Sequence, residues 1–155
     1  MRHAKSSWAN FSLKDFDRPL DERGKSDGPL MAERLKSIVP NLDILIASPA
    51  VRTTQTAEYV SNTYNTDIQF NSQLYHGVPE AYLDALQDLD ENCQNVILFG
   101  HNPGITEIAN MVSKSIIDNI PTCGIIITNT HASWSNISFQ DLTLEHIITP
   151  KNAEF

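Results

Sequence analysis

Two arginines and two histidines have neighbours typical of a site that handles phosphate. Arg2 and His3 precede small and hydroxyl-bearing residues, Arg52 lies among threonines, and His101 stands in a segment rich in glycine and proline. A guanidinium offers a planar fork of donors to phosphate oxygens, and a neutral imidazole can attack phosphorus. Each also has a simpler interpretation: an ordinary basic surface segment for Arg2-His3, a solvated surface charge for Arg52, and a structural residue for His101. Whether they form a site depends on the elements that carry them.

Two short apolar runs predict strands that end near these residues. Residues 42–47 and 95–99 are nearly continuous apolar segments, the pattern of strands buried on both faces of a parallel sheet. Ser48-Pro49 ends the first run and suits the N-cap and first turn of a helix. Arg52 and His101 therefore follow the carboxyl ends of strands, where α/β sheets bind their ligands.

Alternating helices and strands predict one α/β domain over residues 1–155, a three-layer sandwich with a mainly parallel central sheet flanked by helices. Residues 10–27 are polar and without period, which indicates a loop entering the first helix. Helices are expected over residues 29–39, 51–64, 80–89 and 105–112, with a short strand near 67–70. The last third is expected to contain a buried strand at 124–128 and a closing hairpin within 134–149, which gives antiparallel C-terminal strands.

Composition narrows the classes of partner. The chain has 155 residues, with 11 Lys+Arg against 19 Asp+Glu and a net charge of −8, which argues against nucleic acid or an anionic membrane as the main partner. Cys93 and Cys123 have no spacing typical of a zinc site or a disulfide framework, so a cytoplasmic protein with reduced thiols is expected. No apolar run approaches the ~20 residues that span a bilayer. The oligomeric state is not indicated.

Four blocks of sequence resemble the histidine phosphatase superfamily and, more narrowly, its small SixA-type phosphohistidine phosphatases. The blocks occupy residues 2–8, 17–24, 48–57 and 100–104, in the family order, and the resemblance spans nearly the whole chain. It implies a phosphoglycerate-mutase-like fold with His3 as the nucleophile. It also implies that Arg2, Arg52 and His101 bind the transferred phosphoryl group, without a metal or other cofactor. Asn102 is a further candidate for phosphate binding.

The general acid is less clearly indicated. Larger members of the superfamily carry a Glu or Asp after the second Arg block that protonates an alkoxide leaving group. Glu80 is the corresponding candidate and His76 a less usual one, although Glu80 also suits the first turn of a helix for capping reasons. A phosphohistidine substrate would not require such an acid, because imidazole is a less basic leaving group than an alkoxide. Arg18 either borders the pocket or pairs with a nearby aspartate, and Arg23 is a weaker candidate of the same kind.

The start of the chain departs from the family pattern. Family members enter the Arg-His turn through an apolar strand, whereas only Met1 precedes Arg2 here. We therefore expect the first strand, central in the sheet, to be missing from this chain. We hypothesise that the natural protein has apolar residues upstream of Met1.

The resemblance implies a metal-independent phosphatase, a phosphoric monoester or phosphoramidate hydrolase that forms a phosphohistidine intermediate. No segment is long enough to form the lid of the sugar-phosphate mutases, which favours phosphohistidine in a signalling or phosphotransfer protein as the substrate. Two alternatives remain open. One is a broad-specificity phosphatase of small phosphate esters, and the other is a non-catalytic pseudo-phosphatase that binds phosphoproteins.

Overall fold

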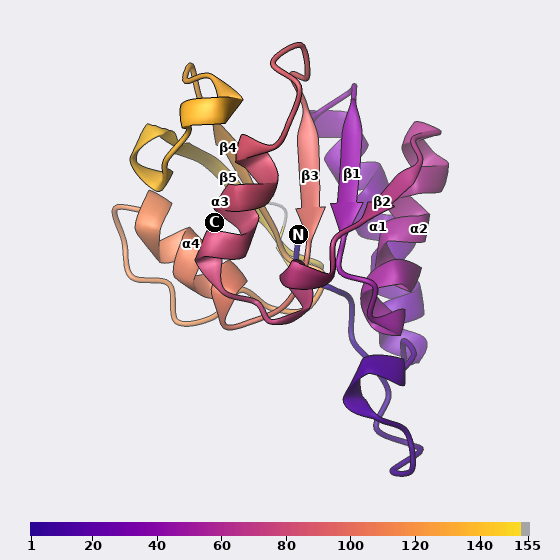
Figure 1. The fold of residues 1–155 in the computed structure, drawn as a ribbon. Coiled ribbons are helices and arrows are strands. Elements are labelled where there is room, and N and C mark those ends of the chain that lie inside the picture. The colour runs from indigo at the N-terminus through magenta and orange to yellow at the C-terminus, as the bar shows by residue number, and fades with distance from the viewer. Residues whose placement is uncertain (153–155) are drawn as a thin grey trace.

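Two pairs of helices enclose the sheet in the computed structural model, which describes residues 1–152 (Figure 1). The helices are α1 (Glu22–Ile38), α2 (Val51–Tyr64), α3 (Pro79–Gln87) and α4 (Gly104–Val112). The strands are β1 (Ile44–Ala47), β2 (Ile68–Phe70), β3 (Val96–Phe99), β4 (Ile125–Asn129) and β5 (Thr143–Ile148). Helices α1 and α2 lie on one side of the sheet, and α3 and α4 lie on the other. The predicted three-layer α/β architecture is confirmed.

The parallel strands bring their carboxyl ends to one edge. Their order is β2-β1-β3, with β1 parallel to both neighbours. Ala47 at the end of β1 stands opposite Phe70 on one side and Phe99 on the other. Strands β4 and β5 form a separate antiparallel pair. A parallel sheet followed by C-terminal antiparallel strands is therefore confirmed, and residues that follow β1 and β3 meet at the same edge.

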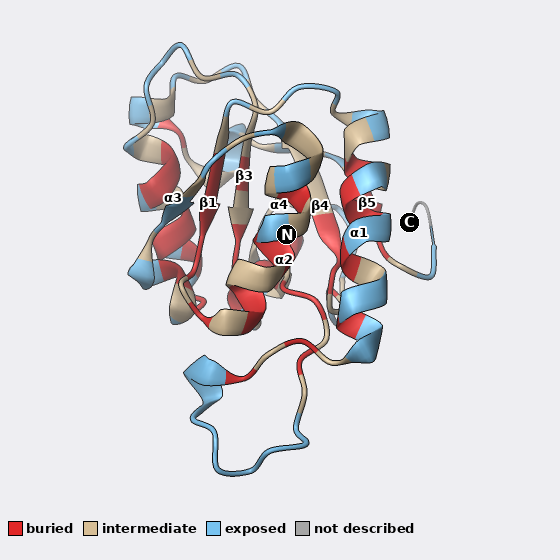
Figure 2. Ribbon diagram, turned by 90° about the vertical axis from the view of Figure 1, so that its right-hand side faces the viewer, coloured by how far each residue is buried: buried red, intermediate tan, exposed pale blue. Residues whose placement is uncertain are grey.

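Alternation along β1 divides the core between the two helical layers. Leu45 packs in the cluster that contains Met31 of α1 and Val60 of α2. Ile46 packs on the opposite face, in the cluster that contains Tyr82 of α3. Successive side chains of a strand point to opposite faces, so a continuous apolar run serves both layers, and the inward faces of the helices are buried (Figure 2). No helix over residues 1–152 has the length and apolar character to span a bilayer.

Residues 1–3 connect the parallel sheet with the antiparallel pair. On the β3 side, the His3 N–H donates to the Gly100 carbonyl at 3.1 Å. On the β4 side, the Arg2 N–H donates to the Gly124 carbonyl at 2.9 Å. Within the described residues, an isolated bridge between Arg2 and Gly100 stands at the place of the strand expected to be missing. Their bonds to both neighbours hold His3 in position.

A cavity of about 520 Å³ continues from these residues between β3 and β4. Met1, Ile97 and Leu98 line one side, and Ile126 lies in the wall that β4 provides. The Met1 ammonium donates to the Leu98 carbonyl at 2.7 Å, and burial lowers its pKa to about 5. Over residues 1–152, β3 pairs with no further strand on this side beyond the bridge at Arg2. The cavity therefore has the position and the apolar walls of a strand site.

Helix α1 begins earlier than predicted, at Glu22 rather than Pro29. Its N-cap is Asp21, whose carboxylate accepts a hydrogen bond from the Gly24 N–H at 2.8 Å. Two glycines form the packed face of the added turns: a Cβ on Gly24 would lie 2.2 Å from a backbone oxygen, and one on Gly28 would lie 2.3 Å from an aromatic ring. The prediction followed apolar spacing, and glycines that pack closely leave no such signal.

The predicted C-terminal hairpin is also corrected, because within residues 134–149 only β5 is a strand. Short 3₁₀ turns occupy Trp134–Asn136 and Phe139–Asp141. The Ser138 hydroxyl donates to the Asp141 carboxylate at 2.6 Å, and the Ser138 N–H donates to the same group at 2.9 Å. Such local side-chain bonds compete with strand pairing. The second strand of the antiparallel pair is β4, which precedes these turns.

Candidate active site

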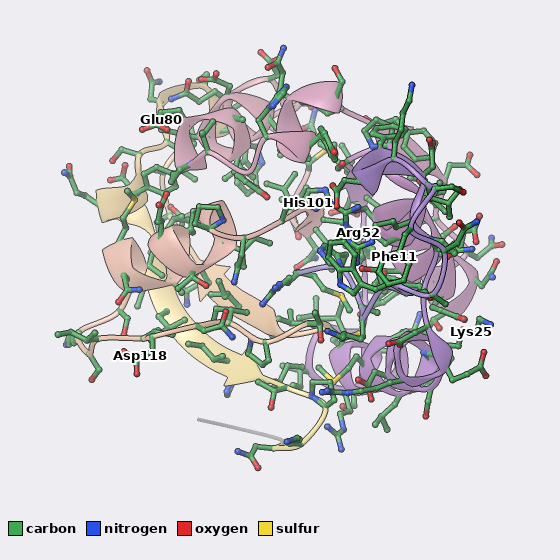
Figure 3. All side chains as sticks on the ribbon, turned by 90° about the horizontal axis from the view of Figure 1, so that it is seen from below. Phe11, Lys25, Arg52, Glu80, His101 and Asp118 are labelled. Carbon is green, nitrogen blue, oxygen red and sulfur yellow. The ribbon has the colours of Figure 1, made fainter. Side chains whose placement is uncertain are left out.

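His3, Arg52 and His101 converge at the carboxyl edge of the parallel sheet, on the underside of the view in Figure 1, and Figure 3 shows Arg52 beside His101. The two imidazole centroids are 5.0 Å apart. Arg52 lies between them, with Nε 3.3 Å from His3 Nε2 and Nη2 3.3 Å from His101 Nδ1. All three side chains are buried. The tertiary structure thus brings together residues that are distant in the sequence.

The hydrogen bonds of His3 determine its tautomer. Nδ1 lies 2.7 Å from the Ala4 carbonyl oxygen, which can only accept, so Nδ1 carries the proton. Nε2 therefore presents its lone pair and accepts from Arg52. Burial lowers the pKa of His3 to about 4, and the charges of Arg52 and Arg2 act in the same direction. His3 is a neutral imidazole near neutral pH, with Nε2 available as a nucleophile.

His101 has the opposite tautomer. Because Arg52 can only donate, His101 Nδ1 accepts its hydrogen bond. The proton then resides on Nε2, which lies 2.9 Å from the Ser48 Oγ and 3.1 Å from the Thr53 Oγ1. Burial lowers the pKa of His101 to about 3, and His3 and Arg52 add to this effect. The Tyr82 hydroxyl further accepts the His101 backbone N–H at 3.0 Å.

Ser48 therefore has a different role from the predicted one. The N-cap of α2 is Ala50, without a side-chain capping bond, and Pro49 precedes the helix. The Ser48 hydroxyl is buried and directed to the imidazole of His101. Ser48 follows β1 and His101 follows β3, so the Ser48 hydroxyl lies beside the imidazole. It bonds to His101 instead of serving as the N-cap of α2.

Asp15 was not among the predicted site residues, yet it contacts Arg52 directly. Its carboxylate lies 2.9 Å from Arg52 Nη2, and its carbonyl accepts from Arg52 Nη1 at 2.6 Å. The Tyr75 hydroxyl donates to the same carboxylate at 2.9 Å. Burial opposes ionisation, but the Tyr75 hydroxyl and the Arg52 charge outweigh it and lower the pKa of Asp15 to about 2. In the sequence, Asp15 is one of several aspartates in an irregular loop and carries no distinguishing signal.

Arg2 and Asn102 meet through a second residue that the sequence did not indicate, Asn119. Arg2 Nη1 donates to the Ile120 carbonyl at 2.6 Å and to the Asn119 Oδ1 at 3.2 Å. Asn102 Nδ2 donates to the same Asn119 oxygen at 2.8 Å. Over residues 1–152, Arg2 Nε and Asn102 Oδ1 are buried without a hydrogen-bond partner. Arg2 thus retains a donor for an anion beside the two histidines, whose pKa values its charge also lowers.

Arg18 borders the site and also pairs with an aspartate, so the two interpretations from the sequence hold together. Its guanidinium donates to the Ser6 Oγ at 2.7 Å and to the Asp15 carboxylate at 2.8 Å, and the side chain is buried. Arg23 instead forms an ion pair with Asp27 at 3.2 Å along α1. Arg18 therefore holds the loop that carries Asp15, whereas Arg23 has no described contact with the site.

The structure does not bring Glu80 to the other candidates. Glu80 is exposed in the first turn of α3 and lies well away from Arg52 and His101 in Figure 3. His76 lies closer: its ring centroid is 5.8 Å from that of Tyr75, which is 5.4 Å from that of His101. In the first turn of a helix, Glu is favoured at the positive end of the helix dipole whether or not it takes part in chemistry.

The donors of the site suit an anion. Arg2 and Arg52 supply permanent positive charge, and the two neutral imidazoles supply a nucleophile and a nitrogen that can accept a proton. Within residues 1–152, His, Cys, Asp and Glu side chains form no group of three that could hold a metal ion. The arrangement can bind a phosphoryl group and attack it from His3 Nε2.

Comparisons with known proteins show which family and which solved structures the chain is similar to. A model of the histidine phosphatase superfamily (branch 1) matches residues 1–76. An uncharacterized chloroplastic protein of Arabidopsis thaliana is 31% identical over 149 residues, which cover 86% of this chain and 66% of that protein. A structure from Agrobacterium tumefaciens assigned to the SixA phosphohistidine phosphatases is 25% identical, with a TM-score of 0.81 over 97% of this chain and 95% of that one. The protein histidine phosphatase SixA, in a complex with tungstate, is 23% identical with a TM-score of 0.82, covering 99% and 97% of the two chains.

Proposed function

Because the chain belongs to the histidine phosphatase superfamily, we propose that it removes phosphate from phosphohistidine on another protein, without a metal, through a phosphohistidine intermediate on His3. The observation that carries the proposal is the state of His3. Its Nδ1–H is bound to the Ala4 carbonyl, and its Nε2 lone pair faces Arg52 among buried cations. The family match and the SixA-type structures support a phosphatase, and the phosphohistidine substrate is the proposed refinement.

In the first step, the Nε2 lone pair of His3 forms a bond to phosphorus as the P–N bond of the substrate breaks. The electron pair of that bond leaves with the substrate imidazole. Arg52 and Arg2 compensate the charge on the phosphoryl oxygens, and Arg2 Nε is a donor that no described residue occupies. The Nδ1–H bond to Ala4 stabilises the positive ring of phosphorylated His3.

In the second step, water attacks phosphorus, the bond to Nε2 breaks, and His3 regains its lone pair as a neutral imidazole. Phosphate leaves, and the proton of the attacking water is released. The proton passes to a phosphate oxygen, because a pKa of about 3 makes the buried His101 imidazole a poor base at neutral pH. The Ala4 carbonyl keeps the proton on Nδ1 throughout, so the ring departs from phosphorus uncharged.

The surroundings of the leaving group favour phosphohistidine over esters. An alkoxide requires a proton from an acid, and Glu80, the predicted acid, is exposed and distant from His101. Asp15 is the carboxylate in contact with Arg52, and a pKa of about 2 makes it a poor proton donor at neutral pH. A substrate imidazole protonated on its second nitrogen leaves as a neutral ring and needs neither residue.

Hydrolysis of small phosphate esters is the second candidate, and the place of His76 beside Tyr75 is the feature that favours it. A His76→Gln variant with ester hydrolysis reduced about a hundredfold and phosphohistidine hydrolysis unchanged would support it. Binding without turnover is less favoured, because the hydrogen bonds of residues 1–3 to both neighbouring strands hold His3 in place.

The proposal is tested by trapping the intermediate. The protein is mixed with ³²P-labelled phosphoimidazole and quenched in alkali, which preserves phosphohistidine. Label is expected on the wild-type chain and on His131→Ala, a variant at an exposed histidine, and is expected to be absent from His3→Ala. Turnover by His3→Ala at the wild-type rate would refute the mechanism, and hydrolysis lost on addition of a chelator would refute metal independence.

A further inference from the structure

A segment beside the candidate site exposes several large apolar side chains. We call residues 7–17 the aromatic arm. The exposed fractions are 61% for Trp8, 90% for Phe11, 38% for Leu13 and 36% for Phe16. In Figures 1 and 2 the arm projects below the carboxyl edge of the sheet as a largely exposed loop. Single exposed apolar residues are common, but a group of large ones in one segment indicates an interaction surface.

The arm is tied to the phosphate-binding residues. The Arg18 guanidinium carbon lies 3.3 Å from the centroid of the Trp8 ring, and the same side chain donates to Ser6 and to Asp15. Asp15 in turn forms an ion pair with Arg52 at 2.9 Å. These bonds hold the base of the arm, which leaves the tip that bears Phe11 and Leu13 exposed.

Aromatic contacts connect the arm with the pocket. The Phe16 ring meets the Tyr75 ring edge-on, with centroids 5.2 Å apart. Tyr75 meets His101 edge-on at 5.4 Å. A series of ring contacts therefore runs from Phe16 of the arm through Tyr75 to His101 of the site. Viewed from below in Figure 3, Phe11 lies on the same side of the molecule as Arg52.

We infer that the aromatic arm is a docking surface for the protein substrate, and that apolar side chains flanking the phosphohistidine pack on Phe11 and Leu13. The inference rests on the proposed function and adds the part of the substrate that is recognised. A phosphoryl group occupies only Arg2, Arg52 and the imidazoles, whereas a peptide that presents it extends over the neighbouring arm. An anionic membrane fits less well as the partner, because the chain carries a net charge of −8.

Two synthetic phosphohistidine peptides test the inference. In one, the phosphohistidine is flanked by leucines, and in the other by serines. The double variant Phe11→Ser/Leu13→Ser is compared with the wild type and with Ile116→Ser, a matched change at a side chain that is 91% exposed and outside the arm. The wild type and Ile116→Ser are expected to prefer the leucine peptide about tenfold in kcat/KM, mainly through KM. In the double variant the preference is expected to fall to about one.

Phosphoimidazole distinguishes the failure of this inference from the failure of the proposed function, because it is too small to reach the arm. No hydrolysis of phosphoimidazole by the wild type would reject the proposed function itself. Hydrolysis of phosphoimidazole with equal kcat/KM for the two peptides would reject the docking surface alone. Sedimentation with vesicles of phosphatidylcholine and phosphatidylglycerol that is lost in Phe11→Ser/Leu13→Ser would also overturn it, in favour of a membrane. A change in the oligomeric state of that variant would overturn it in favour of a second copy of the chain.

Discussion

At the scale of single residues, Asp15 competes for the positive charge that a bound phosphoryl group would need. Its carboxylate lies on Arg52, where a phosphate oxygen could otherwise accept. The Tyr75 hydroxyl and the Arg52 charge keep it ionised far below neutral pH, with a pKa of about 2. A second anion that approaches Arg52 must therefore displace this carboxylate or share the guanidinium with it.

We expect Asp15→Asn to bind oxyanions more tightly than the wild type. The substitution removes a negative charge next to Arg52, whereas the backbone carbonyl at position 15 can still accept from Arg52 Nη1. The inhibition constant of tungstate should fall by about threefold to tenfold, and the effect should shrink at high ionic strength.

Asp17→Asn is the matched control, because Asp17 is an exposed aspartate of the same loop with no described contact to Arg52. It should leave the tungstate constant unchanged. Weaker binding of tungstate to Asp15→Asn would contradict the competition and would show that the carboxylate orients Arg52 for its ligand.

At the scale of elements, the residues that carry His3 form only an isolated bridge beside β3, between Arg2 and Gly100. Residues 1–3 bond to β3 and to the segment that enters β4, and a cavity of about 520 Å³ continues between these strands. Two features of this region oppose stability. Apolar walls lack packing partners, and the Met1 ammonium is buried, which lowers its pKa to about 5.

An apolar extension before Met1 is therefore expected to stabilise the fold. Five residues such as Val-Ile-Val-Leu-Ile could run parallel to β3, fill the cavity and replace the buried ammonium with a neutral amide. The melting temperature, followed by circular dichroism, should rise by at least about 5 °C.

A Ser-Gly-Ser-Gly-Ser extension separates the two contributions. It also removes the ammonium from Met1 but adds little apolar surface, so it should give only a small part of the gain. An apolar extension that leaves the melting temperature unchanged would show that the cavity does not accept a strand.

At the scale of the whole molecule, the buried imidazoles couple stability to pH. The folded pKa values of His3 and His101 are about 4 and about 3, against an ordinary value of 6.5. As the pH falls through 6.5, the unfolded chain takes up protons that the folded chain does not, so these groups lower stability toward acid. Burial likewise lowers the pKa of the Met1 amine from 8.0 to about 5, so this group also lowers the stability of the fold as the pH falls below about 8.

We expect the midpoint of urea unfolding to fall steadily from pH 7 to pH 4. Asp15 contributes little in this window, because its stabilising effect is lost only as the pH falls from its ordinary pKa of 3.8 toward its folded pKa of about 2. His101→Gln should show a smaller fall over the same range, whereas His131→Gln, at an exposed position, should follow the wild type. An equal midpoint at pH 7 and pH 4 would contradict the burial of neutral histidines.

Much of the framework could be predicted because it depends on local patterns. Apolar runs indicated β1 and β3, and their ends indicated where Arg52 and His101 would lie. The helix predicted to follow Ser48-Pro49 is α2, which ends at Tyr64 as expected. Where packing used glycine, as in α1, or where side chains bonded locally, as between Ser138 and Asp141, these patterns carried no signal.

The sequence by itself thus determined the residue types of the site and the strands after which two of them lie. Only the tertiary structure decided their partners. It directed Ser48 to His101, placed Asp15 on Arg52, joined Arg2 to Asn119, and left Glu80 in solvent. The physical reason is that a hydrogen bond between residues far apart in the chain depends on how whole elements pack. The residues within a strand or helix largely determine that it forms. The geometry of a site depends instead on how several strands and helices meet at one edge of the sheet.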